Sequence, residues 1–341
     1  MDKPLYAYVL EKYRQRNIPV TAVFELTYGC NLNCIHCYNP TRSQTRDLSL
    51  EEIADAAEQM RRMGIMDITL TGGELFYRRD WYEAAEIFSR IGFTITVFTN
   101  AVLIDDKVIA QLTQIDPLLI EVSLYGSSPE YYERITRVKG SFARFVNGLE
   151  LLKKSGLNFV LKPVVLRQNF QDYEAMLAFA DSKGYRLRFR FSPCLLPSGR
   201  HRNDFRLSDG EMVELFRHAP EQAEAVFAKC GIGQGGLVVG PTGDIRPCVA
   251  YPTAAGNIRE QTLEVIWQES PLFKELRDIS MDELENCRLC NLKQYCEPCL
   301  ALNLLETGDL LKPSENCRIA ANRKLAKGGV LDEKQSQPRV H

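Results

Sequence analysis

The sequence lacks several features that mark common classes of protein. It has almost no net charge, because 42 lysines and arginines face 44 aspartates and glutamates, giving a formal charge of −2. A chain without an excess of one sign has no overall attraction to nucleic acid or to anionic lipid. No apolar run approaches the ~20 residues that span a bilayer, and the start has no basic-then-apolar targeting segment. We therefore expect a cytoplasmic protein that binds neither nucleic acid nor membrane.

A disulfide framework is not expected either, although the chain has 11 cysteines. An odd number of cysteines in a chain of 341 residues without a secretion signal argues against such a framework. The cysteines are unevenly distributed: three lie between residues 30 and 37, one is Cys194, and seven lie between residues 230 and 317. Clustered cysteines in a reducing compartment more often bind metal. The sequence therefore predicts two metal-bearing regions separated by a cysteine-poor scaffold.

The scaffold alternates strand patterns with helix patterns. The spacing of ~30 residues per unit is typical of βαβ segments. The apolar strands indicate a parallel sheet covered by helices. Six such units are too few for a closed barrel of ~250 residues, so we expect an α/β fold with an open, partial (β/α)6 barrel. Strands are predicted at 20–26, 67–71, 93–99, 118–124, 158–165 and 186–191, and helices at 50–63, 81–91, 105–114, 141–155 and 173–183.

The rest of the chain divides at changes in this rhythm. Residues 230–317 are rich in glycine, proline and cysteine, with a small hairpin predicted at 237–240 and 244–249 and short helices at 297–310 and 317–327. The predicted domains are a helical extension at 1–19, the partial barrel at 20–205, a linking helix at 206–229, a cysteine-rich domain at 230–327 and a polar tail at 328–341.

The first cysteine cluster directly follows the first predicted strand. Cys30, Cys34 and Cys37 have the spacing CxxxCxxC, and ligand-binding groups of α/β folds collect in loops at the carboxyl ends of strands. Three thiolates in one loop can hold three corners of a 4Fe–4S cluster, which leaves one iron without a protein ligand. A structural zinc site is the alternative, but it needs four ligands, and His36 is poorly placed beside Cys37 to be the fourth. Three free, buried cysteines are another alternative.

A glycine-rich turn follows the second predicted strand. Gly72 and Gly73 would let a ligand approach the backbone closely, and Glu74 can accept hydrogen bonds from an ammonium group. CxxxCxxC after the first strand together with Gly-Gly-Glu after the second resembles the radical S-adenosylmethionine superfamily, and this resemblance covers about residues 20–200.

The resemblance implies a mechanism and a set of contacts. S-adenosylmethionine would bind the open iron through its methionyl amine and carboxylate. Reductive cleavage would give methionine and a 5′-deoxyadenosyl radical, which abstracts a hydrogen atom from the substrate. The cluster supplies the difficult chemistry, and the protein supplies binding and exclusion of water. By resemblance, the residues that bind the cofactor are Tyr38, Gly72, Gly73, Glu74, Asn100, Ser123 and Arg137.

The second cysteine region resembles the SPASM extension, which carries auxiliary iron–sulfur clusters in peptide-modifying enzymes. The resemblance implies one auxiliary cluster bound by Cys287, Cys290, Cys296 and Cys317, and a second bound by Cys230, Cys248 and Cys299. The sequence departs from the usual pattern twice: the spacing before Cys299 is short, and residues 231–240 contain no further cysteine. These departures imply that the second cluster has an open iron, a non-cysteine ligand or fewer irons. A pair of zinc sites is the alternative.

Cys194 follows the sixth predicted strand, at the mouth of the expected barrel. Three interpretations remain open for it. It could be the missing ligand of the auxiliary cluster, a hydrogen-atom donor that quenches a substrate radical, or an ordinary buried cysteine, which is a common occurrence.

The substrate is expected from the same resemblance. The chain is similar to maturases of the pyrroloquinoline quinone and mycofactocin type, which implies a peptide substrate and crosslinking, oxidative decarboxylation or epimerisation. The implied partners are a separate leader-peptide-binding protein and an electron donor of the flavodoxin or ferredoxin type. Two alternatives stay open: a radical enzyme that acts on a small molecule or tetrapyrrole, and a zinc-binding module without catalytic activity.

Overall fold

The computed structural model describes residues 12–13, 15–39, 46–189, 191, 204–225, 227 and 230–328, except for the side chains of residues 285 and 286. Residues 329–341 of the predicted polar tail and most of the helix predicted at 1–19 therefore lie outside the described residues, as does Cys194. Within the described part of the chain, no helix is long and apolar enough to cross a membrane.

An open sheet of eight strands organises the molecule, in the order β5-β4-β3-β2-β1-β6-β7-β8. The first five strands are parallel, as expected, and β6 is also parallel to β1. Strands β7 and β8 continue the sheet in antiparallel pairs. The strands are β1 (Thr21–Glu25), β2 (Asp67–Thr71), β3 (Thr94–Thr99), β4 (Leu119–Leu124), β5 (Phe159–Pro163), β6 (Gly236–Val239), β7 (Asp244–Arg246) and β8 (Gly256–Asn257).

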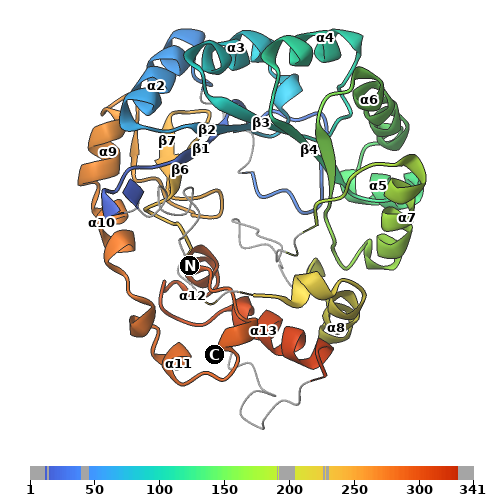
Figure 1. The fold of residues 1–341 in the computed structure, drawn as a ribbon, viewed down its shortest axis with the longest axis vertical. Helices are drawn as coiled ribbons and strands as arrows, with labels where there is room; N and C mark the ends of the chain where they lie inside the picture. Colours follow the sequence, from blue (N-terminus) through green and yellow to red (C-terminus); the bar gives the residue numbers. More distant parts are fainter. Residues whose placement is uncertain are drawn as a thin grey trace, which may run out of the picture.

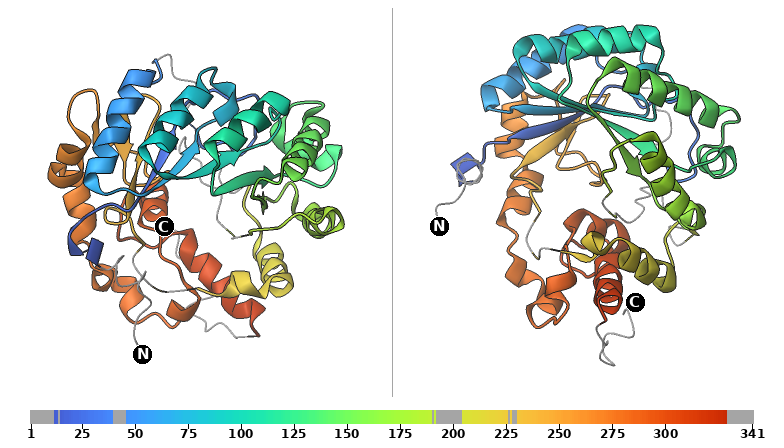
Figure 2. Two further views of the ribbon diagram at one scale, coloured as in Figure 1. Left: turned by 45° about the horizontal axis from the view of Figure 1, so that its top comes forward. Right: turned by 45° about the vertical axis from the view of Figure 1, so that its right-hand side comes forward.

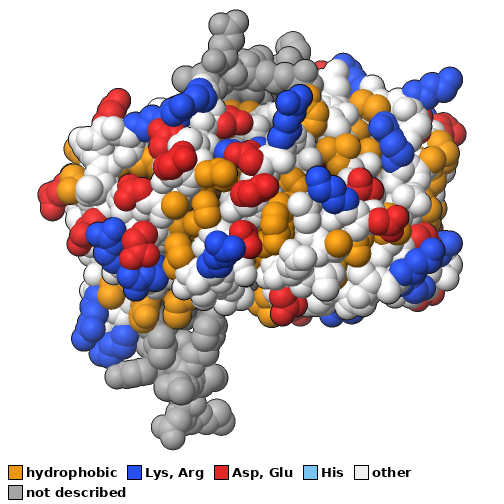
Figure 3. Space-filling view, turned by 90° about the horizontal axis from the view of Figure 1, so that it is seen from above, with side chains coloured by type: hydrophobic (Ala, Val, Ile, Leu, Met, Phe, Trp, Pro, Cys, Tyr) orange, Lys and Arg blue, Asp and Glu red, His pale blue; other side chains and the backbone are white. Residues whose placement is uncertain are grey.

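Helices cover the outer side of the curved sheet (Figure 1). The local sequence starts and stops them: Ser49 and Glu52 form a capping box at the first helix, and Gly64 ends it in the left-handed conformation. On the outer face, side chains of both charges are interspersed with apolar ones (Figure 3). These helices are α2 (Leu50–Met63), α3 (Trp81–Ile91), α4 (Asp106–Ile115), α5 (Pro129–Thr136), α6 (Ser141–Ser155) and α7 (Tyr173–Lys183), with short 3-10 turns at Leu75–Tyr77 and Phe170–Asp172.

Helices α8, α12 and α13 lie across from the inner side of the sheet, whereas α9 lies beside α2 (Figures 1 and 2). Helices α8 and α9 bury apolar side chains in the large core of the sheet and its outer helices, whereas α12 and the segments around residues 276–296 pack in two smaller apolar clusters. The C-terminal helices are α8 (Asp209–His218), α9 (Leu263–Glu269), α10 (Pro271–Asp278), α11 (Glu285–Arg288), α12 (Leu300–Thr307) and α13 (Glu315–Ala326), with 3-10 turns at Pro220–Ala223, Met281–Glu283 and Lys293–Tyr295.

The predicted fold class is confirmed, with one difference in the strands. The segment expected to form the sixth strand makes only an isolated parallel bridge, between Leu187 and Leu161 of β5. At the opposite edge, β6 from the cysteine-rich region pairs in parallel with β1, in register from Thr21 with Gly236 onward. Hydrophobic pattern identifies a strand but not its neighbour, so this long-range pairing was not visible in the sequence.

Candidate active site

The three N-terminal cysteines meet in the loop that leaves β1. Cys30 and Cys34 are half-buried and Cys37 is exposed. Burial, together with the neighbouring thiols of Cys30 and Cys37, raises the pKa of the Cys34 thiol to about 12. Thiols that oppose one another's ionisation can all be thiolates only beside a cation such as iron. The donor set of this loop therefore fits a metal cluster.

The end of α5 fixes the shape of this loop. The backbone N–H of Asn33 donates to the carbonyl of Thr136 at 3.0 Å, and that of Ile35 donates to the carbonyl of Ile135, also at 3.0 Å. A further N–H, that of Leu32, donates to the sulfur of Cys30 at 3.4 Å. The helix that positions the loop was not predicted, because its short sequence carries only about two turns of pattern.

Gly72 and Gly73 contact the chain's own cysteine loop. A Cβ atom on Gly72 would lie 2.3 Å from the carbonyl oxygen of Thr27, and one on Gly73 would lie 2.4 Å from that of Gly29. The Gly73 N–H also donates to the Thr27 carbonyl at 2.7 Å. We expected these glycines to admit a ligand; in the structure their missing side chains let the β2 loop pack directly against the residues that precede Cys30.

Glu74 is buried, and its carboxylate accepts hydrogen bonds from its own chain. Its oxygens accept from the Thr99 hydroxyl at 2.7 Å, the Asn100 backbone N–H at 2.7 Å and the Phe76 N–H at 3.3 Å. Burial raises its pKa to about 7, against the effect of these donors. We expected Glu74 to face an ammonium group, but the carboxylate instead joins the end of β2 to the end of β3.

Asn100 extends this link to the cysteine loop. Its side-chain amide donates to the Asn31 side-chain carbonyl at 2.9 Å and lies 3.9 Å from the sulfur of Cys30. The resemblance implied a cofactor contact for Asn100, and the geometry puts its amide beside the first cysteine. Glu74 therefore influences the loop through two hydrogen-bonded residues.

Three buried polar atoms of the cysteine loop have no hydrogen-bond partner within the described part of the chain: Nδ2 of Asn31, Nδ1 of His36 and Oδ1 of Asn39. An unsatisfied buried polar atom costs about 1–3 kcal/mol. Three of them in one loop indicate that the loop is built to bind a polar ligand.

The remaining predicted cofactor contacts are more scattered. Ser123 is half-buried near the end of β4. Tyr38 is half-buried beside Glu25, and burial raises the pKa of its hydroxyl. Arg137 is exposed at the end of α5, where its backbone has a φ of 56°. The structure thus brings Tyr38 to the cysteine loop and leaves the Arg137 side chain on the surface.

The C-terminal cysteines form two groups. Burial raises the pKa of Cys296 to about 12, and the nearby thiols of Cys317, Cys287 and Cys290 add to this shift. Separately, burial raises the pKa of Cys248 to about 12, with further contributions from Cys299 and Cys230. These neighbours are the two ligand sets that the resemblance implied, although their cysteines interleave along the sequence.

The spacing of the side chains also bears on the zinc alternative. Across the described residues, no three His, Cys, Asp or Glu side chains converge closely enough to hold a single metal ion. A structural zinc site requires such convergence. The cysteines of an iron–sulfur cluster bind separate irons, so a cluster does not require such convergence.

A buried ion pair connects the two cysteine regions. Arg246 of β7, two residues before Cys248, pairs with Glu25 at the end of β1, which is fully buried. Arg246 also contacts Asp244 at 3.0 Å and the Tyr28 hydroxyl at 3.4 Å. The sequence showed each partner on a predicted strand but gave no sign that they meet.

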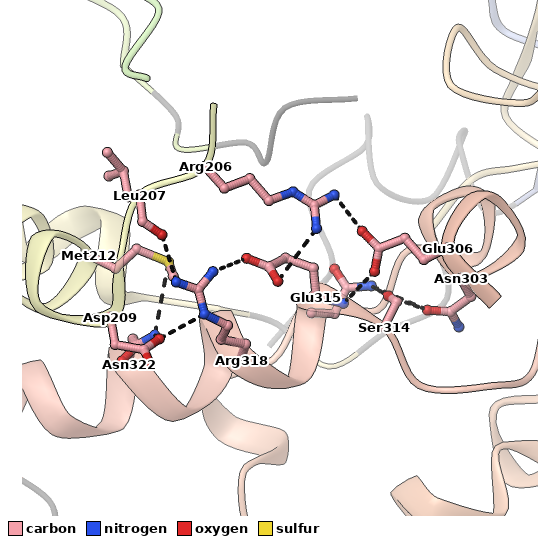
Figure 4. A network of polar contacts seen from close by, with 11 residues as sticks. Arg206, Leu207, Asp209, Met212, Asn303, Glu306, Ser314, Glu315, Arg318 and Asn322 are labelled. Atoms are coloured by element: carbon pink, nitrogen blue, oxygen red, sulfur yellow. Dashed lines mark hydrogen bonds and ion pairs between the residues drawn. The ribbon is translucent and has the colours of Figure 1, made fainter. Parts of the chain in front are cut away.

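A second polar network holds α13, which carries Cys317 (Figure 4). Arg206 pairs with Glu306 of α12 and lies 3.5 Å from Glu315 of α13. Arg318 of α13 donates to the carbonyl of Leu207 at 2.6 Å, just before α8. These contacts fix the helix of one cysteine ligand candidate against two neighbouring helices.

Sequence profiles match both halves of this arrangement. The profile of the radical SAM superfamily matches residues 24–180, which contain the first cysteine loop and β2 to β5. The SPASM profile, described as an iron-sulfur cluster-binding domain, matches residues 230–291. The chain thus contains a radical SAM domain followed by a SPASM domain. The predicted family and enzyme class are thereby confirmed.

Curated relatives of this radical SAM enzyme carry different names. An AdoMet-dependent heme synthase of Methanosarcina barkeri is 27% identical, covering 90% of this chain and 99% of that protein. The mycofactocin maturase MftC of Mycolicibacterium smegmatis is 29% identical, covering 92% and 86%. The PqqA peptide cyclase of Gluconobacter oxydans is 27% identical, covering 81% and 84%.

The fold of the radical SAM enzyme also resembles a solved structure. Streptococcus suis SuiB bound to the precursor peptide SuiA matches with a TM-score of 0.68 at 17% identity, covering 91% of this chain and 81% of SuiB. At this identity the likeness supports the arrangement of the sheet and the C-terminal helices alone.

Proposed function

We propose that this radical SAM enzyme abstracts a hydrogen atom from a peptide. The observation that carries the proposal is the meeting of Cys30, Cys34 and Cys37 at the end of β1, in a loop with unsatisfied buried polar atoms. A 4Fe–4S cluster bound there would supply the electron that breaks the C5′–S bond of S-adenosylmethionine, giving methionine and a 5′-deoxyadenosyl radical. Abstraction of a hydrogen atom from the substrate by that radical would give 5′-deoxyadenosine.

The chain's own residues hold and orient the reacting groups. The three thiolates bind the cluster, and the α5 backbone fixes the loop that carries them. Gly72 and Gly73 allow the second loop to lie against the first, and Glu74 holds Asn100 beside Cys30. We assign contacts with S-adenosylmethionine to Tyr38, Asn100, Ser123 and Arg137.

The C-terminal region would hold two auxiliary clusters. The four-cysteine group would ligate one fully, and the group of Cys230, Cys248 and Cys299 would hold the other with an open position or a non-cysteine ligand. Such clusters can accept the electron that leaves a substrate radical when a bond forms or carbon dioxide is lost. Cys194 stays a candidate fourth ligand or hydrogen donor.

A peptide substrate is supported by the relatives, since one is named a peptide cyclase and SuiB is bound to a precursor peptide. On this proposal the further partners are a separate leader-peptide-binding protein and a flavodoxin- or ferredoxin-type electron donor. A tetrapyrrole substrate is the second candidate, because a heme synthase aligns over nearly its whole length.

Mass spectrometry after anaerobic incubation tests the proposal. The reconstituted enzyme, reductant and S-adenosylmethionine are mixed with a candidate precursor peptide encoded nearby. Loss of two hydrogens indicates crosslinking, loss of carbon dioxide indicates decarboxylation, and one solvent deuteron at an α-carbon indicates epimerisation and favours Cys194 as hydrogen donor. An unchanged peptide alongside a converted porphyrin would favour the tetrapyrrole.

A matched pair of variants separates the cysteine groups in this assay. We expect Cys34→Ala to abolish formation of 5′-deoxyadenosine, because it removes a ligand of the catalytic cluster. We expect Cys317→Ala to retain uncoupled cleavage and to lose product. Full cleavage in Cys34→Ala, or stoichiometric zinc without iron in the anaerobically purified protein, would contradict the proposal.

A further inference from the structure

The inner face of β4 and β5 carries charged side chains that the mechanism above does not use. Ile120, Val122 and Leu124 of β4 are buried in the core shared with the outer helices. Successive side chains of a strand point to opposite faces. Glu121 and Ser123 therefore lie on the inner face, the side on which the cysteine loop and helices α8, α12 and α13 are found (Figure 1).

Glu121 holds two cations. Its carboxylate contacts Nζ of Lys162 at 2.6 Å and Nη1 of Arg188 at 2.9 Å. The Glu121 side chain is 6% exposed, whereas those of Lys162 and Arg188 are 39% and 64% exposed. Glu121, Lys162 and Arg188 together have one positive charge in excess. The exposed surface of the three side chains is mainly that of Lys162 and Arg188.

The cations are also fixed in place. Lys162 Nζ lies 4.4 Å from the centre of the Phe98 ring of β3, a cation–π contact. The backbone N–H of Arg188 donates to the Leu161 carbonyl at 2.9 Å, so the segment after α7 stays beside β5. A lysine and an arginine held in this way keep several N–H donors for other acceptors, since Glu121 takes one from each.

The two cations lie near Ser123, one of the proposed contacts of S-adenosylmethionine. Lys162 pairs in register with Ser123 across β4 and β5, and Ser123 lies one residue from the end of β4, where the loops of the site begin. A group bound by the two cations would therefore lie on the inner face, close below the rim that carries the cysteine loop.

We propose that Lys162 and Arg188 form a subsite that binds a carboxylate of the substrate. The inference rests on the proposed function and deepens it, because it selects substrates with an acidic group near the hydrogen that is abstracted. A guanidinium pairs well with a carboxylate through two parallel hydrogen bonds, and an ammonium adds a point charge. In a peptide the carboxylate belongs to an acidic side chain or to the C-terminus.

Binding of small carboxylates to the holoenzyme with S-adenosylmethionine tests this subsite without turnover. Succinate is the probe and succinamide its uncharged control, in calorimetric titrations. We expect succinate to bind more tightly than succinamide, and Lys162→Gln and Arg188→Gln each to weaken succinate binding about tenfold. Each single variant leaves Glu121 with one cation, so the fold should persist, which thermal unfolding checks.

Glu121→Gln gives a prediction of opposite sign. Removing the carboxylate frees both cations, so succinate should bind several-fold more tightly; a purely structural role for the ion pairs would give no gain. Lys183→Gln, which breaks an ion pair with Glu150 on the outer helices, is the matched control and should leave binding unchanged. The subsite would be overturned if succinate and succinamide bound equally well. It would also be overturned if neither Lys162→Gln nor Arg188→Gln weakened succinate binding.

A blocked amino acid and a blocked dipeptide identify the source of the carboxylate. Acetyl-glutamate carboxamide carries only a side-chain carboxylate, and acetyl-alanyl-alanine only a C-terminal one. The compound that binds more tightly identifies the source of the carboxylate. If succinate binds but neither blocked compound does, the bound carboxylate is not that of a peptide. Formation of 5′-deoxyadenosine is measured separately. Its absence in the wild type refutes the proposed function, whereas a wild type that forms 5′-deoxyadenosine but does not bind succinate refutes only the subsite.

Discussion

The two cysteine-bearing regions are supported in different ways. The first loop leaves a sheet whose strands and outer helices share one large apolar core, and its cysteines are carried by that scaffold. The four-cysteine group lies in a region with two small apolar clusters, one of which includes Cys296 itself. A small core leaves more of the folding free energy to bound metal. The first region should therefore hold its shape without iron, and the second should not.

Removal of iron should have the largest effect on the difference in stability between the two regions. Metal binding can supply on the order of 10 kcal/mol to a small domain, so chelation should unfold the segment from α11 to α13 and leave β1 to β5 intact. Hydrogen exchange read by mass spectrometry measures both regions in one sample. Equal protection of Cys287–Cys317 with and without iron would show that the small clusters suffice.

The ion pair of Glu25 and Arg246 tests how firmly the regions are joined. Arg246→Met leaves the carboxylate of Glu25 buried without its partner, which should cost about 3–5 kcal/mol. Anaerobic urea unfolding measures the loss. Glu25→Leu combined with Arg246→Met removes both charges and should recover much of it. A single variant that costs under ~1 kcal/mol would contradict a buried, coupled pair.

Glu74 should make the first region sensitive to pH. Its pKa is about 7 in the folded protein and near 4.5 in the unfolded chain, so the folded state binds the proton more tightly. Stability is then greatest below pH 4.5 and falls as the pH rises toward 7, by up to about 3 kcal/mol. Unfolding free energies between pH 5 and 8 should show this slope in the wild type and not in Glu74→Gln. The same slope in both proteins would assign it to another group.

The smallest effect is expected at an exposed contact between the regions. Arg259, after β8, contacts Glu52 of α2 at 2.6 Å, with the two side chains 29% and 27% exposed. Such pairs contribute about 0.2–1 kcal/mol, so Arg259→Gln should lower the melting temperature only slightly. A loss comparable to that of Arg246→Met would mean that surface contacts, rather than the buried pair, join the regions.

The sequence predicted the elements better than their neighbours. Helices α2, α3, α6 and α7 have the expected bounds, because apolar periodicity and left-handed glycine stops are local signals. Helix α5 and the pair α9–α10 were missed, since each is only seven or eight residues long. A short segment carries too little periodicity to distinguish a helix from a loop.

For the site too, the sequence predicted which residue types take part but not which residues contact one another. Spacing and family resemblance identified the cysteines that the structure groups together. The inward hydrogen bonds of Glu74, the link from Asn100 to Cys30 and the pairing of Glu25 with Arg246 depend on tertiary contacts between distant segments. The side-chain chemistry of these residues is visible in the sequence, but their partners are set by how strands β1, β2, β3 and β7 are arranged.

Strand β6 has a consequence for dissecting this enzyme. It belongs to the cysteine-rich segment, yet it covers the backbone N–H and carbonyl groups along one side of β1. A chain cut before residue 230 would leave that side of β1 bare, and exposed strand edges pair with other molecules. The shortened protein should accumulate as aggregates instead of a soluble half-enzyme. Domain swaps among relatives would need to carry β6 along with the barrel.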